Sequence, residues 1–294
     1  ERGDFKQNLF KVPIFDAPNL SNDKFKQILL RGDGSGGSVA NDVVFNRLMQ
    51  PVYNGVNRVQ PVIHFFNGEY WGISAMRDLM DEHHYANNFD LDKDNIAIVK
   101  CAGSNCDIDV GTEIDYFDYN SLQDYIINND MANDAFYAQA SSRLDMTTFI
   151  DHMVLQIYSG ANGYERSFWK ARTKENSSYG DGKWRVSVKD FDSALKTNED
   201  WLAHWGTIVN SPNEIMFTKL LANSSFKNSF INRFADLINS VFSSNNFLAV
   251  TNTVFNEVEP YLDENSNRNP AKNFYTTTDK QNLITYGSSH PVEQ

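Results

Sequence analysis

The sequence is poor in cysteine and in basic residues, and it has no long apolar run. Two cysteines are too few for a structural zinc site, which needs three or four ligands. Lys and Arg number 26 against 38 Asp and Glu, and the net charge of −12 argues against a nucleic-acid partner, because phosphate binding needs clustered cations. No stretch of about 18 apolar residues occurs, so we expect no membrane span.

The sequence does contain enough apolar residues for a sizeable core. Hydrophobic residues make up 41% and aromatic residues 13%, which is a globular composition. Cys101 and Cys106 are compatible with either a local disulfide or two free thiols. The sequence begins with Glu and shows no signal peptide. A signal peptide is removed from a mature exported protein, so its absence here does not indicate whether the protein is exported.

Hydrophobic periodicity predicts strands first and helices last. Asn41 is a predicted helix N-cap, and Asn67-Gly68 predicts a tight hairpin turn. This order indicates an α+β fold with a strand-rich part (1–110), a helical part (111–268) and a loose polar tail (269–294). The expected strands are 25–32, 58–66, 70–78, 95–100, 167–173 and 183–189, and the expected helices are 40–53, 119–128, 147–160, 213–223, 225–242 and 246–262.

Three motifs have ordinary structural explanations. "GDGSGG" (32–37) matches a dinucleotide-binding pattern but lacks further βαβ units, so a flexible turn is favoured. "NGEYWG" (67–72) is first a hairpin whose Tyr and Trp pack inward, with a stacking platform as the alternative. "MRDLMDEHHYAN" (76–87) reads as a solvated acidic face, because adjacent histidines point apart on a helix and seldom bind one metal.

The segment from 158 to 192 carries the strongest chemical pattern. A loop containing Asn follows a buried helix, and a hairpin then ends in Asp190-Phe191-Asp192. Protein kinases build their magnesium site from a loop residue and an Asp at the end of such a hairpin. Asp190 and Asp192 supply the hard oxygen ligands that magnesium prefers. The alternative is an ordinary acidic turn.

Several segments, in order, resemble the CotH family, the spore-coat-protein-H-like atypical kinases of bacteria. The likeness covers about residues 10 to 265. The resembling segments are "FKQILLRGDG" (25–34), "RVQPVIHFFNGEYWGISAMRD" (58–78), "LDMTTFIDHMVLQIYSG" (144–160), "DGKWRVSVKDFDSAL" (181–195) and "FTKLLANSSFKNSFINRFADLINSVF" (217–242).

The resemblance implies a distant protein-kinase-like fold. It also implies an enzyme that uses Mg²⁺ or Mn²⁺ to transfer phosphate from ATP to Ser residues of proteins. It identifies Asp190 as the metal-binding Asp and Asp192 as the second acid of the family's Asp-x-Asp. Arg31, at the end of a strand, and Asp78, where the family usually has Glu, are the implied cofactor-contacting residues.

The chain departs from the family pattern in two places. The catalytic loop retains Asn162 as a catalytic residue but has Gly163 where the family has Asp, and Glu165 falls near the family's second Asn as a substitute metal ligand. The family's earlier strand, with a Lys that contacts ATP phosphates, lies before the point where this sequence begins. Loss of a general base lowers the rate roughly 10²–10⁴-fold, so the fold is better supported than the activity.

Two functional hypotheses therefore remain, with a metal-dependent hydrolase using Asp190, Asp192 and Glu165 as a weaker third. The first is a metal- and ATP-dependent phosphotransferase acting on protein Ser. The second is a pseudokinase-like scaffold that binds a protein or carbohydrate at the cell surface. We expect a monomer that is extracellular or at the cell surface, with the cytoplasm as the alternative. The sequence does not identify a substrate or partner.

Overall fold

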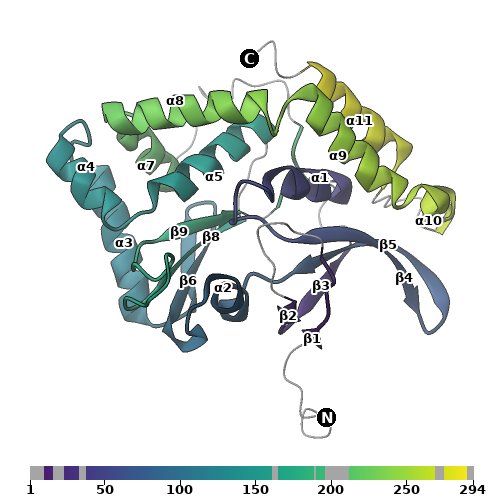
Figure 1. Cartoon of the computed structure of the whole chain (residues 1–294), viewed down its shortest axis with the longest axis horizontal. Coiled ribbons are helices and arrows are strands. Elements are labelled where there is room, and N and C mark those ends of the chain that lie inside the picture. The colour runs from purple at the N-terminus through teal and green to yellow at the C-terminus, as the bar shows by residue number, and fades with distance from the viewer. Residues whose placement is uncertain are drawn as a thin grey trace, which may run out of the picture. The chain divides into compact units, whose positions relative to one another are not determined.

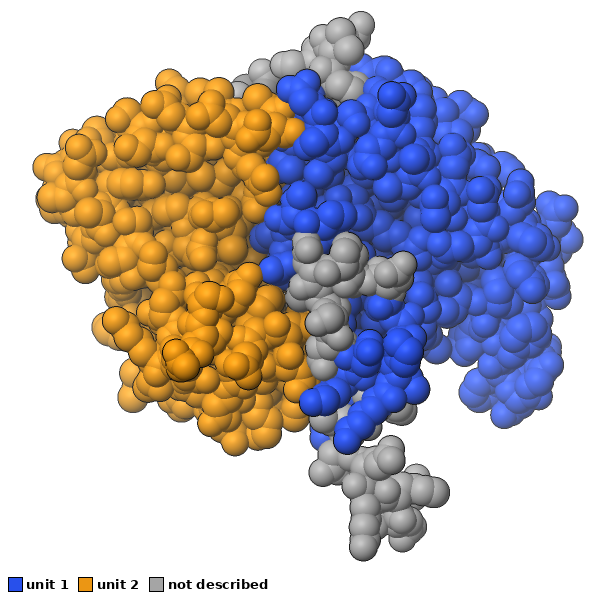
Figure 2. All heavy atoms as spheres, viewed as in Figure 1, with its two compact units in different colours: residues 1–79, 190–196, 237–294 blue, residues 80–189, 197–236 orange. Residues whose placement is uncertain are grey.

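The structure of this chain is a computed structural model that describes residues 10–15, 23–32, 38–160, 165–188, 190–195, 212–268 and 275–289. The chain divides into two compact units, which Figure 2 colours separately. Unit 1 contains residues 1–79, 190–196 and 237–294, and unit 2 contains residues 80–189 and 197–236. The N-terminal half is strand-rich and the C-terminal half is mainly helical, so the predicted α+β class is confirmed.

Unit 1 is built on a three-stranded antiparallel sheet with the order β3-β5-β4 (Figure 1). The turn between β4 and β5 has positive φ at both Asn67 (51°) and Gly68 (82°), as a type I′ hairpin requires, which confirms the predicted turn. The elements of unit 1 are β1 (Phe10–Lys11), β2 (Lys24–Phe25), β3 (Ile28–Arg31), α1 (Val39–Met49), β4 (Val59–Phe66), β5 (Glu69–Asp78), α9 (Ser244–Asn256), the 3₁₀ turn η2 (Glu259–Tyr261), α10 (Leu262–Arg268) and α11 (Thr277–Ser289).

Helix α1 lies in the middle of unit 1, and only Arg47 among its 11 residues is not buried. The predicted N-cap at Asn41 is wrong, because the helix begins at Val39 with Ser38 in the extended cap position. Asn41 and Asp42 fall instead in the first buried turn of the helix. Buried polar groups must find partners, so these two side chains are available to bind another segment of the chain.

The two aromatic residues of the hairpin motif have different surroundings. Tyr70 is buried and its ring contacts Phe65 at a centroid distance of 5.8 Å, which agrees with the packing interpretation. Trp71 is 50% exposed, and the guanidinium of Arg268 lies 5.0 Å from its ring centroid. The motif therefore packs through one aromatic residue and presents the other at the surface.

The expected loose tail contains an ordered helix. Residues Thr277–Ser289 form α11, which packs against α9 and buries Leu283 and Tyr286. Gly287 lies so close to the ring of Phe247 that a Cβ atom at this position would collide with it. The polar composition hid this helix, because only three of its residues, Leu283, Tyr286 and Gly287, are buried.

Unit 2 is built on a four-stranded antiparallel sheet with the order β7-β6-β8-β9. The predicted hairpin of β8 and β9 is confirmed, while β7 and α4 were not anticipated from the sequence. The elements of unit 2 are α2 (Glu82–Phe89), the 3₁₀ turn η1 (Lys93–Asn95), β6 (Ile96–Ala102), β7 (Asn105–Val110), α3 (Glu113–Asn128), α4 (Asp134–Ser141), α5 (Met146–Ser159), β8 (Glu165–Ala171), β9 (Arg185–Val188), α7 (Pro212–Leu220) and α8 (Ser224–Asn239), whose last turn is counted with unit 1.

A disulfide joins Cys101 on β6 to Cys106 on β7 and so resolves the alternative that the sequence left open. The two residues are direct partners in the antiparallel register of these strands. Among the helices that the structure describes, none is both long enough and apolar enough to cross a bilayer.

Candidate functional site

The two acids of the Asp-x-Asp motif meet Arg31 at the end of β3 in unit 1. One guanidinium nitrogen, Nη2, donates to Oδ1 of Asp190 at 2.6 Å and to Oδ2 of Asp192 at 2.8 Å. The side chain of Asp192 is 6% exposed, whereas those of Arg31 and Asp190 are 23% and 30% exposed. The structure thus brings together three of the residues that the sequence analysis selected, in a partly exposed cluster.

The backbone around the acids is fixed by the first turn of α1. The amide of Phe191 donates to the Asp42 carboxylate at 3.0 Å, and the amide of Ser38 donates to the Asp192 carbonyl at 2.8 Å. The ring of Phe191 is buried and lies 5.9 Å from that of Phe45. The buried aromatic residue between the acids therefore anchors the segment and leaves the two carboxylates at the cluster with Arg31.

Asp190 has a backbone conformation that non-glycine residues seldom adopt. Its φ angle is 78°, in the left-handed region. Such a conformation persists only where surrounding contacts impose it, and it is often found at functional sites. Here the contacts of Phe191 and Asp192 with α1 impose it.

The cluster has two carboxylates and one guanidinium, and the pKa values of the two acids shift in opposite directions. Burial opposes ionisation of Asp190, but hydrogen bonds with Arg31 and Asp192 and the charge of Arg31 hold the pKa of its carboxyl below the ordinary value. Burial, followed by the hydrogen bond and charge of Asp190, raises the pKa of Asp192 to about 6. One guanidinium does not fully compensate two neighbouring carboxylates.

Asp78 lies in a different ion pair. Its carboxylate accepts from Nε of Arg58 at 2.9 Å, and both side chains are almost fully buried. The preceding residue, Arg77, forms an ion pair with Asp42. Successive side chains of a strand point to opposite faces, so Arg77 supports the acid cluster through Asp42 while Asp78 faces away from it. Asp78 is thus held in a buried ion pair, and its contact with the cofactor stays a prediction.

A comparison with known families found a match over most of the chain. A family model described as CotH kinase protein matches residues 3–287 of the 294-residue chain. The chain belongs to the CotH family. The match continues past residue 268 and takes in most of α11. A search of the curated proteins found no match.

The remaining predicted site residues of this CotH-family chain are Glu165 and Asn162. Glu165 is an exposed residue at the start of β8 in unit 2, opposite Ala102 of β6. It borders a cavity of about 510 Å³ whose lining includes Lys100, Asp107 and Ser167. Asn162 and Gly163 of the catalytic loop lie outside the described residues, as does 33–37 of the glycine-rich segment.

The donor set of the acid cluster was tested against a divalent metal. Within the described ranges, no group of three or more His, Cys, Asp or Glu residues has the spacing of a complete metal site, and the neighbouring histidines of α2 form none. Magnesium in phosphotransfer sites is commonly held by one or two carboxylates, with water and substrate phosphates completing its shell. Asp190 and Asp192 fit that partial set, because their oxygens already surround one cationic nitrogen.

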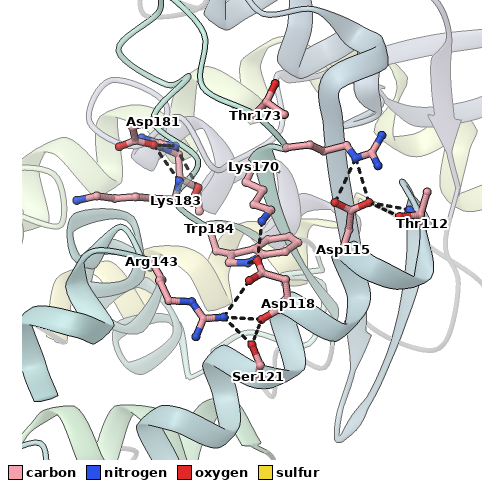
Figure 3. Close-up of polar contacts among 12 residues, drawn as sticks. Thr112, Asp115, Asp118, Ser121, Arg143, Lys170, Thr173, Asp181, Lys183 and Trp184 are labelled. Carbon is pink, nitrogen blue, oxygen red and sulfur yellow. Dashed lines mark hydrogen bonds and ion pairs between the residues drawn. The ribbon is translucent and has the colours of Figure 1, made fainter.

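A second charged cluster, centred on Asp118 of α3, was missed in the sequence (Figure 3). The Asp118 carboxylate accepts from Lys170 Nζ at 2.5 Å, from Trp184 Nε1 at 2.9 Å and from Arg143 at 3.0 Å. Burial opposes ionisation, but the hydrogen bonds from Lys170 and Trp184 lower the pKa of Asp118. With every partner engaged, this cluster joins α3, β8 and the start of β9 and has the character of a structural junction.

The sequence also gave no role to Asp42, which is central to the unit 1 cluster. The signal available was a pair of polar residues, Asn41 and Asp42, at the start of an otherwise apolar helix. Their partners are about 150 residues away in the chain, so only the fold identifies them: Asn41 Nδ2 lies 3.5 Å from the Asp192 carbonyl, and Asp42 accepts from Phe191.

Proposed function

We propose that this chain is a CotH-type phosphotransferase that uses a divalent metal, Mg²⁺ or Mn²⁺, to transfer the terminal phosphate of ATP to Ser residues of a protein. The observation that carries the proposal is the Asp190–Asp192 pair, held by α1 and short of positive charge. In the reaction the Ser oxygen bonds to the terminal phosphorus, the bond to the bridging oxygen breaks, and ADP leaves with that oxygen.

The residues of the chain have distinct roles in this proposal. Asp190 and Asp192 hold the metal, which neutralises phosphate charge when it is bound. Arg31 lies beside them and supplies a guanidinium suited to phosphate oxygens. Asn162, and Glu165 as a further oxygen ligand, remain predictions from the family resemblance. Because Gly163 stands where the family has Asp, the Ser proton passes to solvent or to another acceptor, and we expect slow transfer.

Family membership and the disulfide also support a location outside the cytoplasm. Disulfides persist in oxidising compartments and are rare in the cytosol. We therefore propose an extracellular or cell-surface protein whose acceptor is another protein.

The test is phosphate incorporation from terminally labelled ATP with Mn²⁺, into the protein itself and into a Ser-rich acceptor. Asp190→Asn should reduce incorporation at least about 100-fold, since it removes a metal ligand. Asp263→Asn is the matched control, because Asp263 is an exposed carboxylate on α10 in the same unit. Incorporation that is absent from the wild type, or unchanged in Asp190→Asn, contradicts the proposal.

The pseudokinase-like scaffold is the second candidate, and Gly163 favours it. Thermal denaturation with ATP and Mn²⁺ separates the two, because a ligand that binds only the folded state raises its stability. A stabilised protein without phosphate incorporation indicates a nucleotide-binding pseudokinase. A protein that neither shifts nor incorporates phosphate indicates a scaffold.

A further inference from the structure

Arg31 occupies the position between the carboxylates of Asp190 and Asp192. Its Nη2 atom lies within hydrogen-bond distance of one oxygen from each acid, at 2.6 and 2.8 Å. A cation ligated by these same two oxygens would occupy the position of Nη2. The guanidinium and a metal ion therefore compete for these two oxygens.

The neighbouring charges leave Arg31 as the compensating cation of this pair. Asp42, the next acid, has its own ion pair with Arg77. In the described part of the chain, no other Lys, Arg or His forms an ion pair with Asp190 or Asp192. Without Arg31, two carboxylates, one of them 6% exposed, face each other with no compensating charge at hydrogen-bond distance.

We propose that Arg31 is a resident counter-cation that competes with the divalent metal for Asp190 and Asp192 and so couples metal binding to nucleotide binding. The inference rests on the metal site of the proposed function. Metal alone must displace the guanidinium and leave it without its acidic partners. When nucleotide is also present, the released guanidinium has a new partner, because Arg binds phosphate oxygens in bidentate geometry. Metal therefore binds weakly alone and more tightly with nucleotide.

The direct test is Mn²⁺ affinity without nucleotide, measured from the electron paramagnetic resonance signal of the free ion. Arg31→Gln should bind Mn²⁺ at least about tenfold more tightly than the wild type, because a positive charge within a few Å of the ion is removed. Arg47→Gln is the control: Arg47 lies in the same unit and forms a paired contact with Glu257, at 2.5 and 2.9 Å, away from the acids. Its affinity should equal that of the wild type.

Arg31→Gln also leaves two acids uncompensated, so its fold is checked by thermal denaturation. In EDTA it should melt below the wild type, and Mn²⁺ should raise its melting temperature by more than that of the wild type. Arg31→Lys keeps the charge without the planar guanidinium and should bind Mn²⁺ with intermediate affinity. Adding Asp190→Asn to Arg31→Gln should abolish the tight binding.

The inference and the proposed function fail separately. If Arg31→Gln binds Mn²⁺ no more tightly than the wild type, or if neither protein binds it, the counter-cation role is overturned whatever the phosphate assay shows. If Arg31→Gln binds Mn²⁺ more tightly and no phosphate is transferred, the role stands and the phosphotransferase fails. If the affinity of the wild type for Mn²⁺ does not change when ATP is added, the proposed coupling of metal binding to nucleotide binding is overturned.

Discussion

The two charged clusters of this protein use opposite ratios of charge. In unit 1, two carboxylates, Asp190 and Asp192, share the guanidinium of Arg31. In unit 2, the single carboxylate of Asp118 receives Lys170, Arg143 and the indole N–H of Trp184 (Figure 3). A junction that only holds elements together is best fully compensated, whereas a site that must accept a cation needs spare negative charge.

The pKa values of Asp118 and Asp192 shift in opposite directions. Burial raises the pKa of both acids, but at Asp118 the hydrogen bonds and charges of its cationic partners reverse the effect and lower it. At Asp192 the neighbouring carboxylate of Asp190 adds to burial, and the pKa rises to about 6. The pKa of Asp190 is lowered as that of Asp118 is, so the excess of acid in the unit 1 cluster appears in the raised pKa of Asp192 alone.

The largest expected effect comes from removing the charge of the junction. Asp118→Asn leaves Lys170, which is 12% exposed, without its acid and weakens the acceptor of the buried indole of Trp184. We expect the free energy of unfolding to fall by roughly 2 kcal/mol, because the Trp184 donor is buried while Asp118 itself is 37% exposed and water partly screens its charge. Urea denaturation measures the loss, and a change below about 1 kcal/mol would show that the junction is not structural.

A second prediction concerns His152, a buried histidine of unit 2, at acidic pH. Burial, and then the charge of Arg166, lower the pKa of His152 to about 3. The unfolded chain therefore binds a proton below about pH 6.5 that the folded protein does not bind, and stability falls as pH falls. Between pH 6.5 and pH 5 we expect a loss of about 1.6 kcal/mol from this group.

The control for this pH effect is His152→Gln, which has no titrating group at the position. Its stability, followed by urea denaturation between pH 7 and pH 5, should decline less steeply than that of the wild type. Parallel pH profiles of the two proteins would rule out the buried neutral histidine as the source.

The smallest effect is expected at the under-compensated cluster. Asp192→Asn keeps the shape of the side chain and removes one of two adjacent negative charges, while Arg31 keeps Asp190. In EDTA the free energy of unfolding should stay within about 1 kcal/mol of the wild type or rise, because repulsion between the acids is relieved. A loss as large as that of Asp118→Asn would make this cluster a structural junction as well.

The sequence predicted the parts of the fold that depend on local rules. Asn67-Gly68 specified the hairpin turn through two positive φ angles, and the alternating strands around it followed. Helix α1 was found, but its start was misplaced because a helix buried on nearly every side has no polar face to mark its boundaries. The disulfide depended on β7, whose acidic residues hid the strand that places Cys106 opposite Cys101.

The candidate site was predictable only in part, because some of its residues are contiguous in the sequence and others are far apart. Asp190 and Asp192 were visible because the strand, the aromatic residue and the acids are contiguous in the sequence. The contact of Phe191 with Asp42 and that of Asp190 with Arg31 join residues 149 and 159 positions apart, and no local pattern contains that information. Asp78 was assigned by position in a family motif, and the alternation of β5 turned its side chain toward Arg58.

The most direct measurement is an anomalous-scattering map from crystals grown with Mn²⁺ and a non-hydrolysable ATP analogue. The account predicts a Mn²⁺ peak between the carboxylates of Asp190 and Asp192, with the Arg31 guanidinium moved from its position between them to the phosphates. Arg31 still bridging both acids, with no Mn²⁺ peak at either carboxylate, would contradict it.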